Sequence, residues 1–298
     1  KNKLIIIIMV IKNLVLSGGS YNGLKTFGVL KYLHENGFYD IKNIENIYAT
    51  SVGALIATIL VINLPIEHVY DFIVKRPWDK AFNLSSDMLF NMITEKGIID
   101  KSFFLEIFKK LFKTADIPIN ITMKKFYDIT HINLHFFSVK VNAFELIEIS
   151  HLTHPNLSII DAVYMSCSIP FIVQPMFYKN SYMIDGAVLC NFPLKPCIDN
   201  KENTDDILAI NIINSKNTKM KIDNTTNLLK YGHYIFDSLV IYSNRQKYNS
   251  VEIKNLITIE SEKTNFLMGY KLLQHQRERE KMIAAGYDLA KIFLQSNL

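Results

Sequence analysis

A serine, a glycine-rich loop and an aspartate are the residues of this chain whose types and spacing could do chemistry together. Ser51 follows a β-type run, Asn46–Thr50, and a long apolar helical run begins directly after it. This order is typical of a nucleophile elbow, which projects the serine Oγ out of the backbone while the next helix directs its N-terminus at the site. A serine at a helix start can equally be a plain N-cap, so further evidence is needed.

Small residues flank the serine at the positions where such a turn needs them. The usual pattern is Gly-x-Ser-x-Gly, in which the glycines let the strand and helix backbones approach closely. Gly53 stands two residues after Ser51, and Ala49 stands two residues before it, in place of the first glycine. Alanine nearly meets the same need, so we expect the turn to form.

The loop 18–23 offers backbone N–H groups at the end of an expected strand, 13–17. Ester hydrolysis builds negative charge on a carbonyl oxygen, and loss of one N–H donor to that oxygen typically costs roughly 3–4 kcal/mol. Glycines let the backbone turn its N–H groups outward and let a substrate come close. Because the carboxyl ends of parallel strands share one edge of a sheet, we expect this loop and Ser51 at the same edge.

A phosphate-binding interpretation of the same loop fits less well. Gly18 and Gly23 have the spacing of a P-loop. Lys25 and Thr26 follow, but Leu24 separates them from the second glycine. On a helix one inserted residue swings a side chain by roughly a quarter turn or more, away from the phosphates that the lysine must reach.

A serine nucleophile needs a base, and Asp185 is the candidate. A pair such as Asp185-Gly186 is very often only a turn, but here Ile184 precedes it and Val188-Leu189 follow. These apolar neighbours predict a buried carboxylate. Burial raises the pKa of an aspartate and makes it a better base.

Strands and helices alternate along the chain and must position these residues. We expect strands over 13–17, 44–50, 207–213 and 256–260, a hairpin of 133–141 with 144–150, and a short strand region over 181–188 that Asp185-Gly186 interrupts. We expect helices over 24–36, 52–62, 65–75, 100–113, 159–168, 225–246 and about 272–295. The alternation predicts an α/β protein, a three-layer α/β/α sandwich with a mostly parallel central sheet.

Composition narrows the class of protein. A chain of 298 residues with 49% hydrophobic residues can build a sizeable core, and we expect one domain over 10–298, with the motifs in 13–195 and C-terminal strands and helices in 205–298. The net charge of +5 comes without a dense Lys/Arg run, so nucleic-acid binding is not expected, while a weak preference for anionic membrane surfaces is compatible with it.

Metal, cofactor and disulfide chemistry are not expected. The three cysteines, Cys167, Cys190 and Cys197, are too few for a disulfide framework and fit a reducing compartment. No Cys/His spacing resembles a zinc site, because the close pairs His131/His135 and His151/His154 lie in strand or loop sequence.

The apolar start of the chain, 4–11, is too short to span a bilayer and lacks a small-residue cleavage site. With no other span of sufficient length, we expect a cytoplasmic protein with peripheral membrane contact. Met9 could mark the native start.

Three separated motifs resemble the patatin-like phospholipase family in order and context. Residues 16–23, running on to 28–30, resemble its glycine-rich oxyanion loop, and 49–53 resemble its nucleophile elbow. Asp185-Gly186-Ala187, with Asn191 and Pro193 behind it, resembles its Asp-Gly-Ala/Gly motif. The lead-in 166–171 followed by Gln174-Pro175 is also present, so the resemblance covers about residues 13–195.

The resemblance implies a three-layer α/β/α fold and a phospholipase A-type acyl hydrolase that works through an acyl-enzyme with a Ser–Asp dyad. Carried over by position, Ser51 is the nucleophile and Asp185 is the base. The implied oxyanion donors are Gly18, Gly19 and Ser20, and the residues that support the motifs are Gly23, Ala49, Gly53, Gly186 and Ala187. The implied substrate is an acyl ester of a phospholipid or related lipid.

Three positions depart from the family pattern. Ser20 replaces a third glycine, Asn22 replaces an Arg or Lys, and Ala49 replaces the first glycine of the elbow. The backbone N–H survives at Ser20, whereas Asn22 removes a positive charge that could help the oxyanion or a phosphate headgroup. These departures motivate an alternative, a lipid-binding or regulatory protein that keeps the fold without strong catalysis.

Two further alternatives concern the mechanism and the access of lipid. A Ser–His–Asp triad would need a histidine in a loop after a late strand, but His233 and His275 both fall in helical sequence. The aromatic segment 171–178 could line an acyl channel or belong to the core. The stripe of Met282, Leu289 and Phe293 could rest on a membrane or dock on the sheet.

Overall fold

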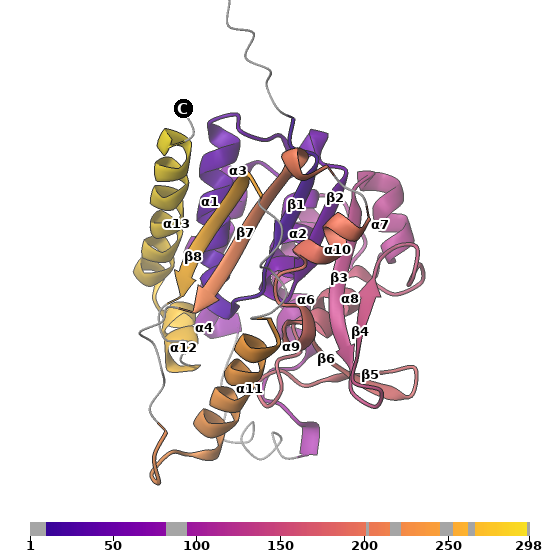
Figure 1. The fold of residues 1–298 in the computed structure, drawn as a ribbon, viewed down its shortest axis with the longest axis vertical. Helices are drawn as coiled ribbons and strands as arrows, with labels where there is room; N and C mark the ends of the chain where they lie inside the picture. Colours follow the sequence, from indigo (N-terminus) through magenta and orange to yellow (C-terminus); the bar gives the residue numbers. More distant parts are fainter. Residues whose placement is uncertain are drawn as a thin grey trace, which may run out of the picture.

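The computed structural model describes residues 10–81, 94–200, 203–214, 222–244, 253–261 and 266–296. These residues form an eight-stranded mixed sheet in the order β5-β6-β3-β2-β1-β7-β8, and β4 pairs with β3 outside that path (Figure 1). The strands are β1 (Asn13–Leu16), β2 (Asn46–Thr50), β3 (Asn133–Lys140), β4 (Glu145–Ile149), β5 (Met176–Tyr178), β6 (Ser181–Asp185), β7 (Ile207–Asn214) and β8 (Asn255–Ser261).

Helices cover both faces of this sheet. They are α1 (Gly23–Glu35), α2 (Val52–Val61), α3 (Ile66–Lys75), α4 (Trp78–Ala81), α6 (Lys101–Thr114), α7 (Met123–Thr130), α8 (Ile159–Ser166), α9 (Ala187–Cys190), α10 (Leu194–Asp199), α11 (Leu228–Asn244), α12 (Phe266–Gln274) and α13 (Gln276–Ser296). Short 3-10 turns are η1 (Ser20–Asn22), η2 (Ile41–Asn43) and η3 (Thr204–Asp206).

The central strands carry apolar side chains on both faces of the sheet, so both of their faces are buried. On β1, Leu14 and Leu16 enter the large core that α1, α2 and α8 cover. Val15, between them, enters a smaller core with Phe192 and Leu194 on the opposite face. Figure 1 shows α9 and α10 over that second face. The expected three-layer α/β/α sandwich is therefore confirmed.

The parallel part of the sheet extends from β3 to the edge strand β8, and the antiparallel part is formed by β4, β5 and β6 beside β3. Strands β1, β2, β3, β7 and β8 run parallel to their neighbours within this set. Strands β4 and β6 run antiparallel to β3, and β5 runs antiparallel to β6. The predicted hairpin of 133–141 with 144–150 is present, and Lys140 lies opposite Glu145 at its turn.

Three predicted elements differ from the structure in their bounds. The strand region expected over 181–188 ends at Asp185, and Ala187 begins the short helix α9. Only glycine fits at this corner, because a Cβ at Gly186 would lie 2.3 Å from the carbonyl oxygen of Phe137. The C-terminal helix expected over 272–295 is two helices, α12 and α13, which meet at His275. The helix expected over 225–246 ends at Asn244, and 245–246 lie outside the described residues.

A buried arginine accounts for the break at His275. The side chain of Arg279 is 5% exposed. Its guanidinium donates to the carbonyl oxygens of Leu272 and Leu273 at the end of α12. It also donates to Val74 and Arg76 at the end of α3. Since the last carbonyls of a helix have no partner inside it, this one cation caps two helix ends and joins α12 to α3.

Helix α13 packs against α1 through two glycines rather than resting on a free surface. A Cβ at Gly28 would lie 2.0 Å from the carbonyl oxygen of Ile283, and a Cβ at Gly286 would lie 1.9 Å from that of Lys25. Phe293 packs edge-on against Phe38, with ring centroids 5.6 Å apart. The sequence predicts that the stripe of the C-terminal helix either rests on a membrane or docks on the sheet. Docking within the fold is correct, and the helix packs on α1 as well as on the sheet.

Gly286→Ala should destabilise the protein because its methyl group must displace the backbone of α1. We expect a loss of about 1–3 kcal/mol in the free energy of unfolding, measured with urea. Gly269→Ala in α12 is the matched control, since its methyl group would meet no described atom closer than 3.9 Å. The control should be neutral or more stable by up to about 1 kcal/mol, and equal stabilities of the two variants would contradict the close helix packing.

Candidate active site

The register of three strands brings Ser51 and Asp185 together. Phe137 of β3 lies opposite Thr50 of β2, and the next residue, Ser138, lies opposite Asp185 of β6. Strand β4 pairs with the opposite edge of β3 over these residues. Strands β2 and β6 therefore pair with the same edge of β3, one after the other. Because β2 runs parallel and β6 antiparallel to β3, their carboxyl ends face each other at this point.

Ser51 forms the sharp corner between β2 and α2. Its φ of 55° and ψ of −128° are sparsely populated by residues with a side chain, so the turn is strained. The Ser51 N–H donates to Ser166 Oγ at 2.9 Å, which helps hold that conformation. The Ser51 hydroxyl donates to Asp185 Oδ2 at 2.6 Å. The predicted elbow is therefore present as a backbone conformation, with its hydroxyl on a carboxylate.

Both oxygens of Asp185 are held. Oδ2 accepts from the Ser51 hydroxyl, and Oδ1 accepts from the N–H of Ala187 at 2.8 Å. The side chain is fully buried. Burial raises the pKa of Asp185 from 3.8 to about 7, and the two hydrogen bonds oppose part of that rise. The sequence predicts both the burial and the direction of this shift.

The end of α8 fixes the nucleophile and the carboxylate from one side. Ser166 accepts from the Ser51 N–H, and the carbonyl of Ser168 accepts from the Asp185 N–H at 2.9 Å. Cys167 lies between them, where burial and the charge of Asp185 raise the pKa of its thiol well above the ordinary value. The lead-in 166–171, which the sequence analysis identifies only by resemblance, thus has a positioning role that sequence reasoning missed.

Small residues allow the elbow to close. A Cβ at Gly53 would lie 2.6 Å from the carbonyl oxygen of Leu16, so α2 can cross β1 only with glycine at this position. A Cβ at Gly23 would lie 2.3 Å from Cγ2 of Val52. Ala49 is fully buried in the large core, so its methyl group fits where the usual pattern has glycine.

The loop 18–23 lies against the elbow. A Cβ at Gly18 would lie 3.1 Å from Cβ of Ser51 and 2.5 Å from Oδ1 of Asn191. The Gly18 N–H donates to the carbonyl of Asn191 at 2.9 Å. The N–H groups of Gly19 and Ser20, by contrast, donate to no residue that the structure describes. Two of the three expected donors therefore have no partner among the described residues.

Asn22 orients the loop 18–23 through hydrogen bonds to the Gly19 carbonyl. The side chain is buried, and its Nδ2 donates to the carbonyl of Gly19 at 3.3 Å and to Ser261 Oγ at 3.1 Å. The Asn22 N–H also donates to the Gly19 carbonyl, at 3.1 Å. In a trans peptide the carbonyl and the following N–H point in opposite directions, so these bonds fix the direction of the Ser20 N–H. Ser20 itself has a φ of 51°, in the left-handed region.

The residues proposed for other chemistries lie elsewhere. Among the described side chains, no histidine hydrogen-bonds to Ser51 or Asp185, and His233 lies outside the described side chains. Lys25, the lysine of the P-loop interpretation, donates to the carbonyl of Glu260 on β8. No group of three or more residues suited to a metal ion occurs in the described part of the chain.

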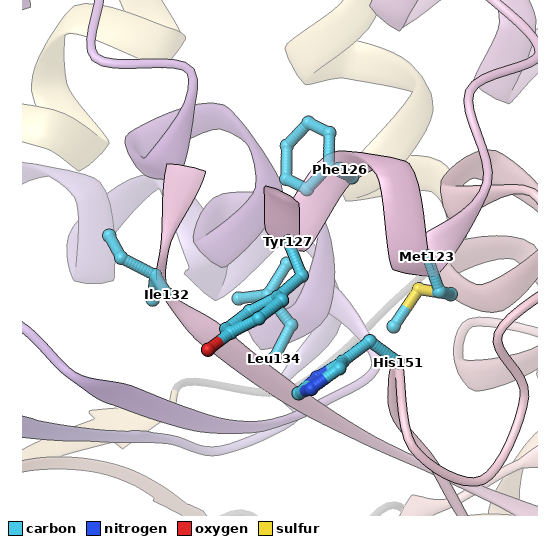
Figure 2. A pocket seen from close by; sticks show the side chains of 6 residues that line it. All are labelled: Met123, Phe126, Tyr127, Ile132, Leu134 and His151. Carbon is cyan, nitrogen blue, oxygen red and sulfur yellow. The ribbon is translucent and has the colours of Figure 1, made fainter. Parts of the chain in front are cut away.

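One histidine of the weak metal pairs belongs to a small apolar pocket. The rings of His151 and Tyr127 are stacked, with centroids 3.9 Å apart, and Figure 2 shows both beside Leu134. The pocket has no room for a molecule of the size of water. Burial and the nearby Lys124 lower the pKa of His151. These features describe ring packing, not a ligand site.

The aromatic segment 171–178 is mixed in burial. Val173 is part of the core, whereas Phe171 and Phe177 are 51% and 61% exposed. The segment therefore belongs partly to the core and partly to the surface. Among the helices that the structure describes, none has both the length and the apolar character needed to cross a bilayer.

Comparison with known proteins places this geometry in context. A family model described as patatin-like phospholipase matches residues 14–198. Uncharacterized protein R571 of Acanthamoeba polyphaga mimivirus is 27% identical over 240 residues, which cover 80% of this chain and 78% of that protein. Probable lipid hydrolase 463L of Invertebrate iridescent virus 6 is 26% identical over 206 residues, covering 67% and 69%. The crystal structure of VipD from Legionella pneumophila has a similar fold, with a TM-score of 0.55 and 18% identity over 96% of this chain and 67% of that one.

The raised pKa of Asp185 should make stability depend on pH. Since the folded protein binds this proton more tightly than the unfolded chain, its free energy of unfolding should fall as the pH rises from about 4 to above 7, by an amount on the order of 4 kcal/mol. Asp185→Asn lacks this titration. Urea unfolding at about pH 5 and about pH 8 should show a smaller loss for the variant than for the wild type. The same pH dependence in both proteins would contradict the assignment.

Proposed function

Because this chain belongs to the patatin-like phospholipase family, we propose that it is a lipid acyl hydrolase that cleaves fatty-acyl esters of phospholipids or related lipids. The observation that carries the proposal is the buried hydrogen bond from the Ser51 hydroxyl to Asp185, 2.6 Å long. The similarity to a viral protein named Probable lipid hydrolase 463L supports the same reaction class.

Acylation begins at this hydrogen bond. Asp185 Oδ2 takes the proton of the Ser51 hydroxyl while the serine Oγ forms a bond to the ester carbonyl carbon. The carbon becomes tetrahedral and its oxygen becomes negative. When the intermediate collapses, the bond to the alcohol oxygen breaks, and the protonated Asp185 returns the proton to that leaving group. The acyl chain remains on Ser51 as an ester.

The N–H groups of Gly19 and Ser20 would hold the negative oxygen. They have no partner among the described residues, and Gly18 presses the loop against the elbow. The positive end of α2 adds a favourable dipole at the same place. Gly18 could contribute a third donor only if its N–H left the carbonyl of Asn191.

Water completes the reaction. Asp185 accepts a proton from a water molecule, whose oxygen attacks the acyl carbon. The bond between the acyl carbon and Ser51 Oγ then breaks, and the serine regains its proton from Asp185. The released product is a fatty acid. A base with a pKa of about 7 is half ionised near neutral pH, so Asp185 can both accept and return a proton there.

The engaged N–H of Gly18 favours one second candidate, a lipid-binding protein of weak or no catalysis. A fluorophosphonate probe separates the two. Stoichiometric labelling that disappears in Ser51→Ala supports the hydrolase. Lipid binding without labelling supports the binding protein.

Ester hydrolysis should require Ser51 and Asp185 and no histidine. Ser51→Ala and Asp185→Asn should each lower ester hydrolysis by about three orders of magnitude or more, measured as product release from a mixed panel of phospholipids and neutral lipids. Replacing any one histidine with glutamine should leave hydrolysis within about threefold of wild type.

The histidine variants are needed because pH dependence alone does not separate the two bases. A carboxyl with a pKa of about 7 and an ordinary histidine give the same loss of activity at acidic pH. Full loss of activity on removal of one histidine, His275 or His233 included, would overturn the dyad.

Asn22→Asp should weaken catalysis. The aspartate side chain has nearly the same shape but cannot donate to the Gly19 carbonyl. Only the backbone N–H of residue 22 then holds this carbonyl, and the direction of the Ser20 N–H is less firmly fixed. We expect kcat to fall by about tenfold or more. Ser261→Ala is the matched control, because it removes the other acceptor of the same amide and leaves the Gly19 bond in place. A fall of equal size in both variants would argue against this role.

A further inference from the structure

The outer face of α11 exposes apolar side chains almost without interruption. The exposed apolar residues along it are Leu228, Tyr231, Ile235, Leu239 and Tyr242, which are 39–75% exposed. They recur every three or four residues, so they lie in one stripe along the helix. A helix on the surface of a globular protein normally presents polar side chains there, and a contiguous exposed apolar surface of this kind marks an interaction site.

Phe171 extends this stripe sideways. Its ring is 51% exposed and would lie 3.2 Å from a Cβ built at Gly232 of α11. Gly232 lies between Leu228 and Ile235 along the helix, so the ring lies at one side of the stripe. We call these six side chains, the five of the stripe and Phe171, the α11 patch.

The opposite face of α11 packs directly beside the candidate active site. Phe236 and Val240 contact the cluster that contains Val188 and Leu189 of α9. Helix α9 begins two residues after Asp185, and its first N–H holds the carboxylate. Figure 1 shows α11 next to α9, on the side of the sheet away from α1 and α13. Whatever the α11 patch binds is therefore brought close to the dyad.

We propose that the α11 patch is the surface through which this protein docks on a lipid bilayer. The proposal rests on the proposed function, since acyl lipids are presented to an enzyme at a membrane surface. A helix that lies flat in the interface buries Leu and Ile side chains among the acyl chains and keeps tyrosine hydroxyls at the headgroups. Tyr231 and Tyr242 stand on either side of Ile235 and Leu239 in this way.

Charge favours a membrane that carries anionic lipids. The described charged side chains of α11 are the cation Lys230 and the half-buried anion Asp237, which lie on one side of the helix and offset each other, so the attraction comes from the chain as a whole. The whole chain has a net charge of +5. A basic protein with an apolar docking face gains attraction from the negative headgroups in addition to apolar burial.

A second copy of the chain fits the patch less well. The six side chains of the α11 patch offer on the order of 600 Å² of apolar surface, so a stable dimer, which buries roughly 800 Å² of total surface on each partner, would also have to bury the polar surroundings of the patch. A bilayer needs no complementary shape, so it can use a narrow stripe of this size.

Vesicle flotation of the full chain tests the proposal. The patch variant is Leu228→Gln, Leu239→Gln and Tyr242→Gln together. The matched control is Ile129→Gln, Leu152→Gln and Ile292→Gln, three apolar residues of similar exposure (56–75%) on other elements. With vesicles of phosphatidylcholine and phosphatidylglycerol, the patch variant should lose at least about tenfold in binding, and the control should stay within about twofold of wild type.

Hydrolysis measured on the same proteins separates this proposal from the proposed function. The ratio of activity on vesicles to activity on a water-soluble short-chain ester should fall at least about tenfold in the patch variant. Patch-dependent flotation without hydrolysis of either substrate by wild type would support docking and overturn the hydrolase. Unchanged flotation of the patch variant, with hydrolysis intact, would overturn docking alone. A wild-type dimer that the patch variant converts to a monomer, with flotation unchanged, would also overturn docking and identify a subunit interface.

Discussion

The meeting of β2 and β6 along one edge of β3 is the constraint on which the candidate site depends. Two strands that share an edge end to end must both stop where they meet, and each then turns away from the sheet. Ser51 is the first residue past β2, and Asp185 is the last residue of β6. Their contact is thus a consequence of register, and a shift of either strand by one residue would also invert the faces to which its side chains point.

The residues around this junction keep Ser51 and Asp185 in contact and buried from solvent. Gly53 and Gly186 permit backbone contacts that a Cβ would prevent, and the end of α8 binds a backbone N–H of each partner. An isolated buried carboxylate is costly, so its two hydrogen bonds are needed to keep it in place. The same burial raises the pKa of Asp185 to about 7 and so produces a base suited to neutral pH.

Much of this arrangement can be predicted from the sequence because the motifs are local. The turn at Ser51, the loop 18–23 and the buried aspartate each follow from neighbouring residues, and the alternation of apolar runs predicts the α/β layers. The register of β6 on β3 cannot be predicted in this way, since it depends on contacts between distant segments. The same holds for Asn22, whose partner Ser261 is on β8, and for Arg279, whose partners lie on two other helices. The helix that begins at Ala187, within the strand region assigned to 181–188, cannot be predicted for a related reason, because the contact that requires glycine at 186 is with the backbone of Phe137.

The most direct test of the Ser51–Asp185 account is to identify the covalent intermediate. Wild-type protein is mixed with a phospholipid that carries an isotopically labelled acyl chain, quenched during turnover, digested and analysed by mass spectrometry. The account predicts the labelled acyl group as an ester on the peptide that contains Ser51, formed and lost at rates compatible with turnover. Hydrolysis that proceeds with the label on another residue, or with no acyl-enzyme when the chemical step is slow enough to trap one, would contradict it.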